Sequence, residues 1–235
     1  MGGPTCIEAF ENAVSRAGIV DLSYTLESGM PAWPTQGRFS STVYESYDQG
    51  DTAIHSTVTM SEHTGTHIDA PKHFIRGAVS VDKLPLKQVM GRGVYIEASF
   101  IEPKKSFSLQ NLKDFEKQNG EIKKGDIVML RFGWDRKYAV QPNSGAFLKD
   151  WPGIGLDAAG YLAEKGVAAV GCDCLALDPF DSDNPAHFLL LGKGIPIIEN
   201  ITNLSRLPVF SYVIGLPNKF KDGSGSPIRL IAFVD

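Results

Sequence analysis

The segment from residue 62 to residue 74, EHTGTHIDAPKHF, holds three of the five histidines of the chain together with an aspartate. Imidazole and carboxylate groups are ligands that Zn(II), Mn(II) and Fe(II) accept. His63 and His67 have the i, i+4 spacing of a helical metal site, but Thr64, Gly65 and Thr66 are poor helix formers and Pro71 would end a helix. The pattern therefore favours an extended chain.

On an extended chain, every second side chain faces the same way. His63, His67 and Asp69 would then share one face and could bind one metal ion, with positions left open for water and substrate. Gly65 would leave space for the ion and permit a bend between the first two histidines. His73 could reach water at the metal without being a ligand, which is the position of a general base. The residues expected to face the protein body are Thr64, Thr66, Ile68 and Ala70.

A structural explanation competes with this one, because most histidines lie on the surface or form hydrogen bonds in the core. We assign that ordinary role to the isolated His55. The clustering of the other three favours a metal site with catalytic chemistry.

The composition is that of one globular domain. The chain has 235 residues, of which 43% are hydrophobic and 21% are charged, and we expect a single domain over 1–235. Residues 1–19 form an N-terminal extension that could be helical. A net charge of -4 without a basic stripe argues against nucleic acid as a partner. Without a signal-peptide core or a run of about 18 apolar residues, we expect a cytoplasmic protein with no membrane partner. Three buried, reduced thiols are expected for Cys6, Cys172 and Cys174.

Short apolar runs alternate with a few amphipathic segments. The pattern predicts helices over 108–120, beginning at a cap on Ser108, and over 155–166, ending at Gly166, with a weaker candidate over 7–18. Long connections between strands predict a mixed α/β or α+β sheet that curls toward a barrel, flanked by a few helices. The predicted strands are residues 56–60, 93–99, 126–132, 167–172, 196–201, 209–216 and 228–234.

The segment HTGTHIDAPKHF resembles the His-x-Gly-Thr-His-x-Asp-x-Pro-x-His signature of the cyclase family of metal-dependent hydrolases, which contains bacterial kynurenine formamidase and isatin hydrolase. Four further stretches are similar to the family: VDLSYTLESGMPAWP, RFGWD, HFLLLGKGIPIIENI and PIRLIAFVD. The resemblance covers residues 20–235. It implies a swivelling β/β/α-type domain.

The same resemblance implies roles for individual residues. His63, His67 and Asp69 would bind metal, and His73 would be the acid/base catalyst. His187 and Glu199, twelve residues apart, would complete the ligand set for one or two Zn(II) or Mn(II) ions per subunit. The apolar run IPIIENIT supports this role for Glu199 independently, because a charge buried there needs a cation to balance it. Trp33 would contact the substrate's ring, although a tryptophan packed in the core is the alternative.

Hydrolysis of an amide-type C–N bond in a small molecule is the expected activity. The metal would supply hydroxide at neutral pH, and His73 would transfer protons. The leading substrate is N-formylkynurenine, which would make the protein an arylformamidase. The alternatives are an isatin-type cyclic amide or lactone and a noncatalytic relative that only binds metal. The resemblance also implies a homodimer or homotetramer.

Some residues stay without a role at this point. Asp173 and Asp178 could orient a histidine ligand, but they could equally be turn residues at strand ends. Cys172 and Cys174 make their stretch richer in cysteine than the family pattern, which leaves the shape of the inner pocket open.

Overall fold

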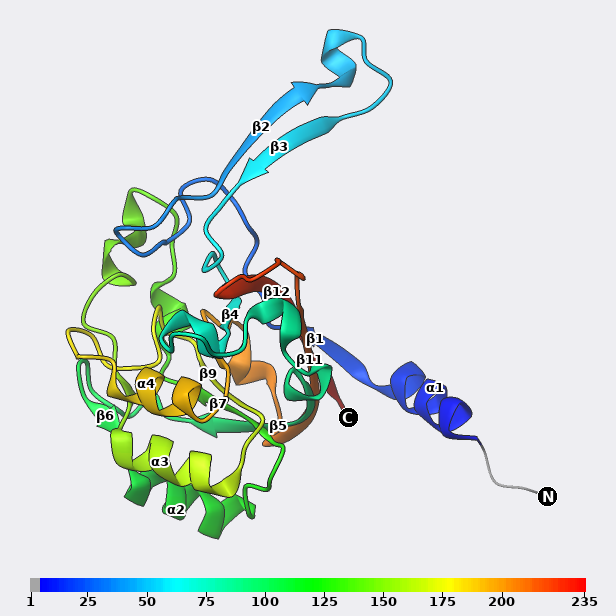
Figure 1. Ribbon diagram of the computed structural model, residues 1–235. Coiled ribbons are helices and arrows are strands. Elements are labelled where there is room, and N and C mark those ends of the chain that lie inside the picture. Colours follow the sequence, from blue (N-terminus) through cyan, green and yellow to red (C-terminus); the bar gives the residue numbers. More distant parts are fainter. Residues whose placement is uncertain (1–4) are drawn as a thin grey trace.

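A closed sheet of seven strands forms the centre of the computed structural model, which describes residues 5–235 (Figure 1). The sheet closes because its first and last strands, β12 and β4, pair with each other, with Gly225 opposite Asp69. An eighth strand, β1 (Gly18–Asp21), pairs with the end of β12 outside the closed ring. The order around the ring is β12 (Gly225–Val234), β11 (Phe210–Pro217), β5 (Met90–Glu97), β7 (Ile127–Arg131), β9 (Ala169–Cys172), β10 (Ile197–Glu199) and β4 (His67–Asp69).

Four neighbouring strands of the ring, β5, β7, β9 and β10, run parallel, and the other pairings are antiparallel. Strand β7 is buried along its whole length because both of its faces are covered. Its residues Ile127 and Met129 belong to the core inside the barrel, whereas Val128 and Leu130 belong to the core under the helices. The prediction of a mixed sheet curled into a barrel is confirmed.

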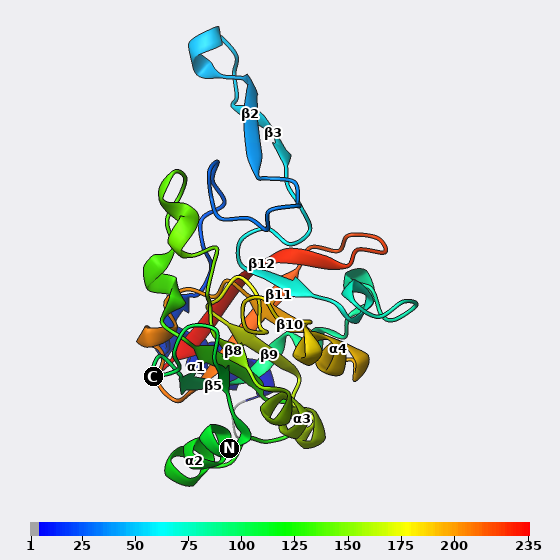
Figure 2. The ribbon, with the colours of Figure 1, turned by 90° about the vertical axis from the view of Figure 1, so that its left-hand side faces the viewer.

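Three helices cover the outer face of the parallel strands, α2 (Leu109–Asn119), α3 (Leu156–Lys165) and α4 (Pro185–Gly192) (Figure 2). Ser108 caps α2 through a reciprocal pair of hydrogen bonds with Asn111, and Gly166 ends α3 in the left-handed conformation. Both helices were predicted. Helix α4 was not predicted, because its side chains are almost all apolar and show no amphipathic period.

The predicted helix near the start is α1 (Cys6–Arg16), which begins at a capping box formed by Thr5 and Glu8. It lies away from the barrel, as Figure 1 shows, and none of its side chains is buried. The prediction extended too far, because Gly18 already belongs to β1. The prediction of three buried thiols is wrong for Cys6, which is exposed on this helix, and right for Cys172 and Cys174.

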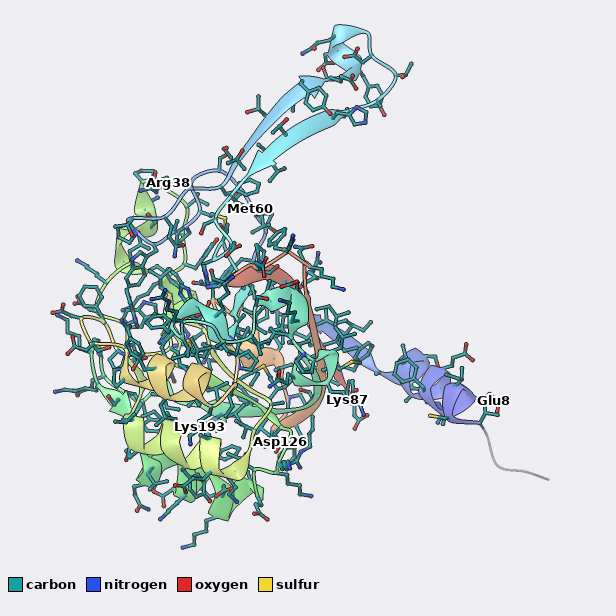
Figure 3. The ribbon with its side chains drawn as sticks, viewed as in Figure 1. Glu8, Arg38, Met60, Lys87, Asp126 and Lys193 are labelled. Carbon is teal, nitrogen blue, oxygen red and sulfur yellow. The ribbon has the colours of Figure 1, made fainter. Side chains whose placement is uncertain are left out.

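A long hairpin of β2 (Ser40–Glu45) and β3 (His55–Thr59) projects from the barrel in both ribbon views, with Met60 at its foot (Figures 1 to 3). Strand β3 was predicted, but it pairs only with β2 and takes no part in the barrel. His55 is exposed on it and forms an ion pair with Glu45, which fits the ordinary role expected for this histidine.

Two short strands, β6 (Ser106–Phe107) and β8 (Gly153–Ile154), pair in parallel as a separate ribbon. Within residues 5–235, none of the helices combines the length and the apolar character needed to cross a bilayer.

Candidate active site

The histidine-rich segment is extended only at β4, where it lies between β10 and β12. The prediction of one continuous extended chain from His63 to His73 is wrong, because Gly65 turns the chain at a φ of +62° and Pro71 starts a 3₁₀ turn that contains His73. The predicted bend at Gly65 is confirmed. The prediction that Gly65 leaves space for the ion is wrong, because the side chains of Leu26 and Met30 fill that space and would lie 2.8 and 2.9 Å from an added Cβ. The four residues predicted to face inward, Thr64, Thr66, Ile68 and Ala70, are all buried.

His63, His67 and Asp69 nevertheless converge. Nδ1 of His63 lies 2.7 Å from Oδ1 of Asp69, and Nε2 of His67 lies 3.4 Å from the same oxygen. These three ligand atoms are close enough together to hold one metal ion.

A second group of potential ligands shares Asp69 with the first. Nε2 of His187, on α4, lies 3.0 Å from Oε1 of Glu199 and 3.7 Å from Oδ2 of Asp69. Glu199, on β10, also lies 3.5 Å from Nε2 of His67 through its other oxygen. All five predicted ligand residues therefore meet in one place, with Asp69 shared by two possible ion positions.

Hydrogen bonds made by Nδ1, on the side of the ring away from Asp69 and Glu199, fix the orientation of two of these imidazoles. Nδ1–H of His67 donates to the carbonyl of Gly65 over 2.8 Å, and Nδ1–H of His187 donates to Asp178 over 2.6 Å. Asp178 also accepts from the backbone N–H groups of Ala186 and His187, so the same carboxylate caps the first turn of α4. In each ring, Nε2 is then the nitrogen that faces Asp69 and Glu199, as a metal ligand requires.

The charges of the site fit a divalent cation. Asp69 and Glu199 are 1% and 5% exposed, and two buried carboxylates this close need positive charge to balance them. Although burial acts in the opposite direction, hydrogen bonds from His63 and His67 hold the pKa of Asp69 well below its usual value. Bonds to Asp178 and Glu199 likewise outweigh burial and raise the pKa of His187 well above its usual value. Protonated imidazoles can supply the balancing charge, and a metal ion would supply it while leaving the ligand nitrogens bare.

His73 differs from the five potential ligands. Its ring stacks on that of His63 with centroids 3.9 Å apart, and it forms no side-chain hydrogen bond within residues 5–235. Burial lowers its pKa to about 4. The ring is therefore neutral at neutral pH, and its one unprotonated nitrogen is available to a proton donor in the cavity.

These groups line a cavity of about 260 Å³. Its other walls are apolar at Trp33, Phe74, Leu175 and Ala176, and polar but neutral at Thr35, Gln36 and Asn184. Trp33 is 39% exposed, so it lies on the cavity wall instead of in the core. The cavity combines a ring-sized apolar surface with a cluster of proton-transfer and metal-binding groups.

The residues that the sequence analysis left without a role have clear structural tasks. Asp173 accepts hydrogen bonds from the backbone of Phe132 and Trp134 and so holds the turn that follows β7. Asp178 orients His187, which is one of the two roles that the sequence left open for it. Cys174 is buried immediately before the wall residues Leu175 and Ala176. Cys172 is equally buried, and neither cysteine is among the residues that line the cavity.

The chain is similar to several known proteins. A family model described as putative cyclase matches residues 20–179. A kynurenine formamidase from Bacillus cereus is 30% identical over 214 residues, which cover 90% of this chain and 95% of that protein. The corresponding protein of Bacillus anthracis is 31% identical over the same shares of the two chains. Among solved structures, isatin hydrolase A from Ralstonia solanacearum is similar with a TM-score of 0.90 and 27% identity, over 100% of this chain and 99% of that one.

Proposed function

The chain belongs to the putative cyclase family, and from that premise we propose that it is a metal-dependent hydrolase that cleaves an amide-type C–N bond. The observation that carries the proposal is the convergence of five metal-binding side chains and the unbonded ring of His73 on one aromatic-lined cavity. We assign His63, His67, Asp69, His187 and Glu199 to the metal, which would be Zn(II) or Mn(II). The two ligand groups that share Asp69 support two ions per subunit, although one ion would satisfy either group alone.

A divalent ion bound by these residues would lower the pKa of its bound water toward ~7 and polarise the substrate's carbonyl group. The protein supplies the remaining parts of the reaction. His73, neutral because burial lowers its pKa to about 4, would accept a proton from the attacking water and deliver one to the departing nitrogen. Trp33 and Phe74 would position an aromatic ring, and the apolar wall at Leu175 would limit access of bulk water.

N-formylkynurenine is the leading substrate, because curated relatives that match most of the chain are kynurenine formamidases. One observation favours a second candidate, an isatin-type cyclic amide. N-formylkynurenine carries an amino-acid carboxylate, whereas the cavity lining contains neither lysine nor arginine among the residues that the structure describes. A neutral ring needs no such cation. The similarity in fold to isatin hydrolase A points the same way.

The deciding experiment measures hydrolysis of N-formylkynurenine and of isatin by protein loaded with zinc, loaded with manganese, or treated with a chelator. Metal-dependent release of kynurenine would support the arylformamidase, and opening of isatin alone would support the second candidate. Metal-loaded protein that hydrolyses neither compound nor any other amide would instead be a noncatalytic metal-binding relative, and the proposal would be wrong.

We also propose that the protein assembles as a homodimer or homotetramer. The hairpin and α1 both extend from the barrel with large apolar side chains exposed, among them Ile7, Phe10, Val43 and Val58. Such surfaces on a chain of this size fit contacts with other copies.

A further inference from the structure

Glu62 and Ser224, two residues outside the proposed ligand set, form a chain of hydrogen bonds that reaches Nε2 of His63. Oε2 of Glu62 accepts hydrogen bonds from both the backbone N–H and the hydroxyl of Ser224, over 2.8 and 2.6 Å. Oγ of Ser224 lies 2.9 Å from Nε2 of His63. These contacts join the turn that precedes β4 to the loop that precedes β12.

The direction of each hydrogen bond in this chain follows from the number of protons available. A carboxylate only accepts, so the single hydroxyl proton of Ser224 is committed to Glu62. The hydroxyl oxygen must then accept from Nε2–H of His63. Nδ1 is the nitrogen of His63 that faces Asp69, at 2.7 Å. In the metal-free protein Nδ1 would carry a proton as well, because a carboxylate only accepts. A bound metal ion would take the place of that proton and leave Nε2–H as the one N–H group of the ring.

The ring of His63 thus has the opposite orientation to the other two imidazoles, with Nδ1 and not Nε2 facing the ligand cluster. His67 and His187 direct Nδ1–H away from the centre, toward Gly65 and Asp178, and direct Nε2 inward. We propose that Glu62 and Ser224 are positioning residues that keep the proton of His63 on Nε2, so that His63 binds the metal through Nδ1 while His67 and His187 bind through Nε2.

The place of the His63 ring is fixed by contacts that do not involve these hydrogen bonds. A Cβ added at Gly225 would lie 2.5 Å from Cε1 of His63 and 2.9 Å from its Nδ1, so the ring lies directly against the backbone of β12. The ring also stacks on His73. Packing therefore holds the ring in place, and the bond to Ser224 determines which nitrogen carries the proton.

The inference rests on the proposed function only through its metal ion. Groups that orient a ligand imidazole typically contribute ~10- to 100-fold to metal affinity. Ser224 contacts the ring directly and Glu62 acts through Ser224, so removal of the hydroxyl should have the larger effect. In the double variant, the two losses should not add, because both residues act through the same hydrogen bond.

Nuclear magnetic resonance on the full chain, labelled with nitrogen-15 in histidine and loaded with zinc, tests the assignment. Long-range correlations between ring protons and ring nitrogens identify the protonated nitrogen of each imidazole, and the His63 signals are assigned by their loss in His63→Gln. We expect the proton of His63 on Nε2 and those of His67 and His187 on Nδ1. A His63 proton on Nδ1 would overturn the inference.

Zinc affinity, measured by competition with a chelator, is the second test. Ser224→Ala should bind zinc ~10- to 100-fold more weakly, and Ser224→Thr, which keeps a hydroxyl, should recover part of that loss. Ser211→Ala is the matched control, because the buried hydroxyl of Ser211 forms no hydrogen bond in the described part of the chain. A folded Ser224→Ala protein with unchanged affinity would contradict the proposal.

If Ser224→Ala does not fold, Glu62→Gln serves in its place, since it keeps an acceptor oxygen and removes the charge. It should weaken zinc binding by a smaller factor, and no weakening would count against the role of Glu62. None of these measurements needs turnover. The predicted proton positions in a protein that hydrolyses no amide would refute the proposed function alone, whereas an active enzyme with the opposite His63 tautomer would refute this inference alone.

Discussion

At the scale of single residues, His73 and Asp69 have separable tasks, although both lie at the same cavity. Asp69 belongs to both potential ligand groups, while His73 belongs to neither. We expect His73→Ala to keep its metal but lose ~10²- to 10⁴-fold in rate, as removal of an acid/base group does. Asp69→Ala should lose metal as well as activity.

Elemental analysis of the purified proteins and the hydrolysis assay together check this division of roles. His55→Ala is the control, since His55 is exposed on the distant hairpin and should retain both metal and activity. Equal metal loss in His73→Ala and Asp69→Ala would refute the division.

Asp178 combines a ligand-orienting role with a structural one, and its variant should therefore show two defects. Asn in its place presents an amide N–H₂ group to donors that now meet a carboxylate. We expect Asp178→Asn to lower the free energy of unfolding by about 1–3 kcal/mol and zinc affinity by ~10- to 100-fold. Urea denaturation and chelator competition measure these effects. Asp183→Asn, in the exposed loop nearby, should change neither quantity.

The site residues that could be predicted from the sequence are those whose role is indicated by the residues next to them in the chain. His63, His67, Asp69 and His73 stand within one short motif, and Glu199 stands out as a charge in an apolar run. Glu62 and Ser224 carry no such signal, and for Asp178 the sequence left a ligand-orienting role and a turn role open. Each acts through a partner that the fold brings close, such as the pair of Glu62 and Ser224, which are 162 positions apart.

At the scale of elements, β8 packs against the loop after β9, and the position of this loop affects the proposed metal site. Gly153 lies so close to this loop that an added Cβ would overlap the carbonyl oxygen of Leu177 and lie 2.5 Å from the carbonyl carbon of Asp178. Both loop residues serve the site, since Leu177 donates its N–H to Glu199 and Asp178 holds His187. The backbone cannot rotate away from a new methyl group as a side chain could.

Gly153→Ala should therefore weaken metal binding and lower the free energy of unfolding by about 1–3 kcal/mol, the usual cost of overpacking, although Gly153 touches no ligand. Thermal unfolding with and without zinc, together with chelator competition, measures both effects. Gly145→Ala is the matched control, because nothing lies within 4 Å of its added Cβ and its φ is not positive. If the two variants behaved alike, packing of β8 would have no influence on the site.

Elements were predictable where periodicity and caps agree, as in α2 and α3, and less so where tertiary contacts decide. Strand β4 has three residues and is extended mainly because β10 and β12 pair with it on either side. Strand β3 has a clear strand sequence, but sequence alone did not reveal that it would leave the barrel in a hairpin.

At the scale of the whole molecule, the hairpin gives the proposed assembly a specific test. A hairpin of two strands is marginally stable alone, and Val43 and Val58 lie on one of its faces at 50% and 49% exposure. We expect Val43→Ser combined with Val58→Ser to shift the protein toward the 25.5 kDa monomer in light scattering at a fixed concentration.

Thr42→Ser combined with Thr57→Ser is the control, since this directly opposed pair lies on the other face of the hairpin. It should leave the mass unchanged. A wild-type chain that is already a monomer would refute the proposed homodimer or homotetramer.

The closure of the barrel also determines when, during synthesis of the chain, the active site can form. His67 and Asp69 lie on β4 and are synthesised early, but both strands that pair with β4, β10 and β12, come near the end of the described chain. Glu199 arrives with β10, and the Gly225 backbone against which His63 rests arrives only with β12. In a nascent chain on the ribosome, the ligand motif is therefore synthesised long before the complete metal-binding site can form. Catalysis must wait until β12 has emerged and closed the ring.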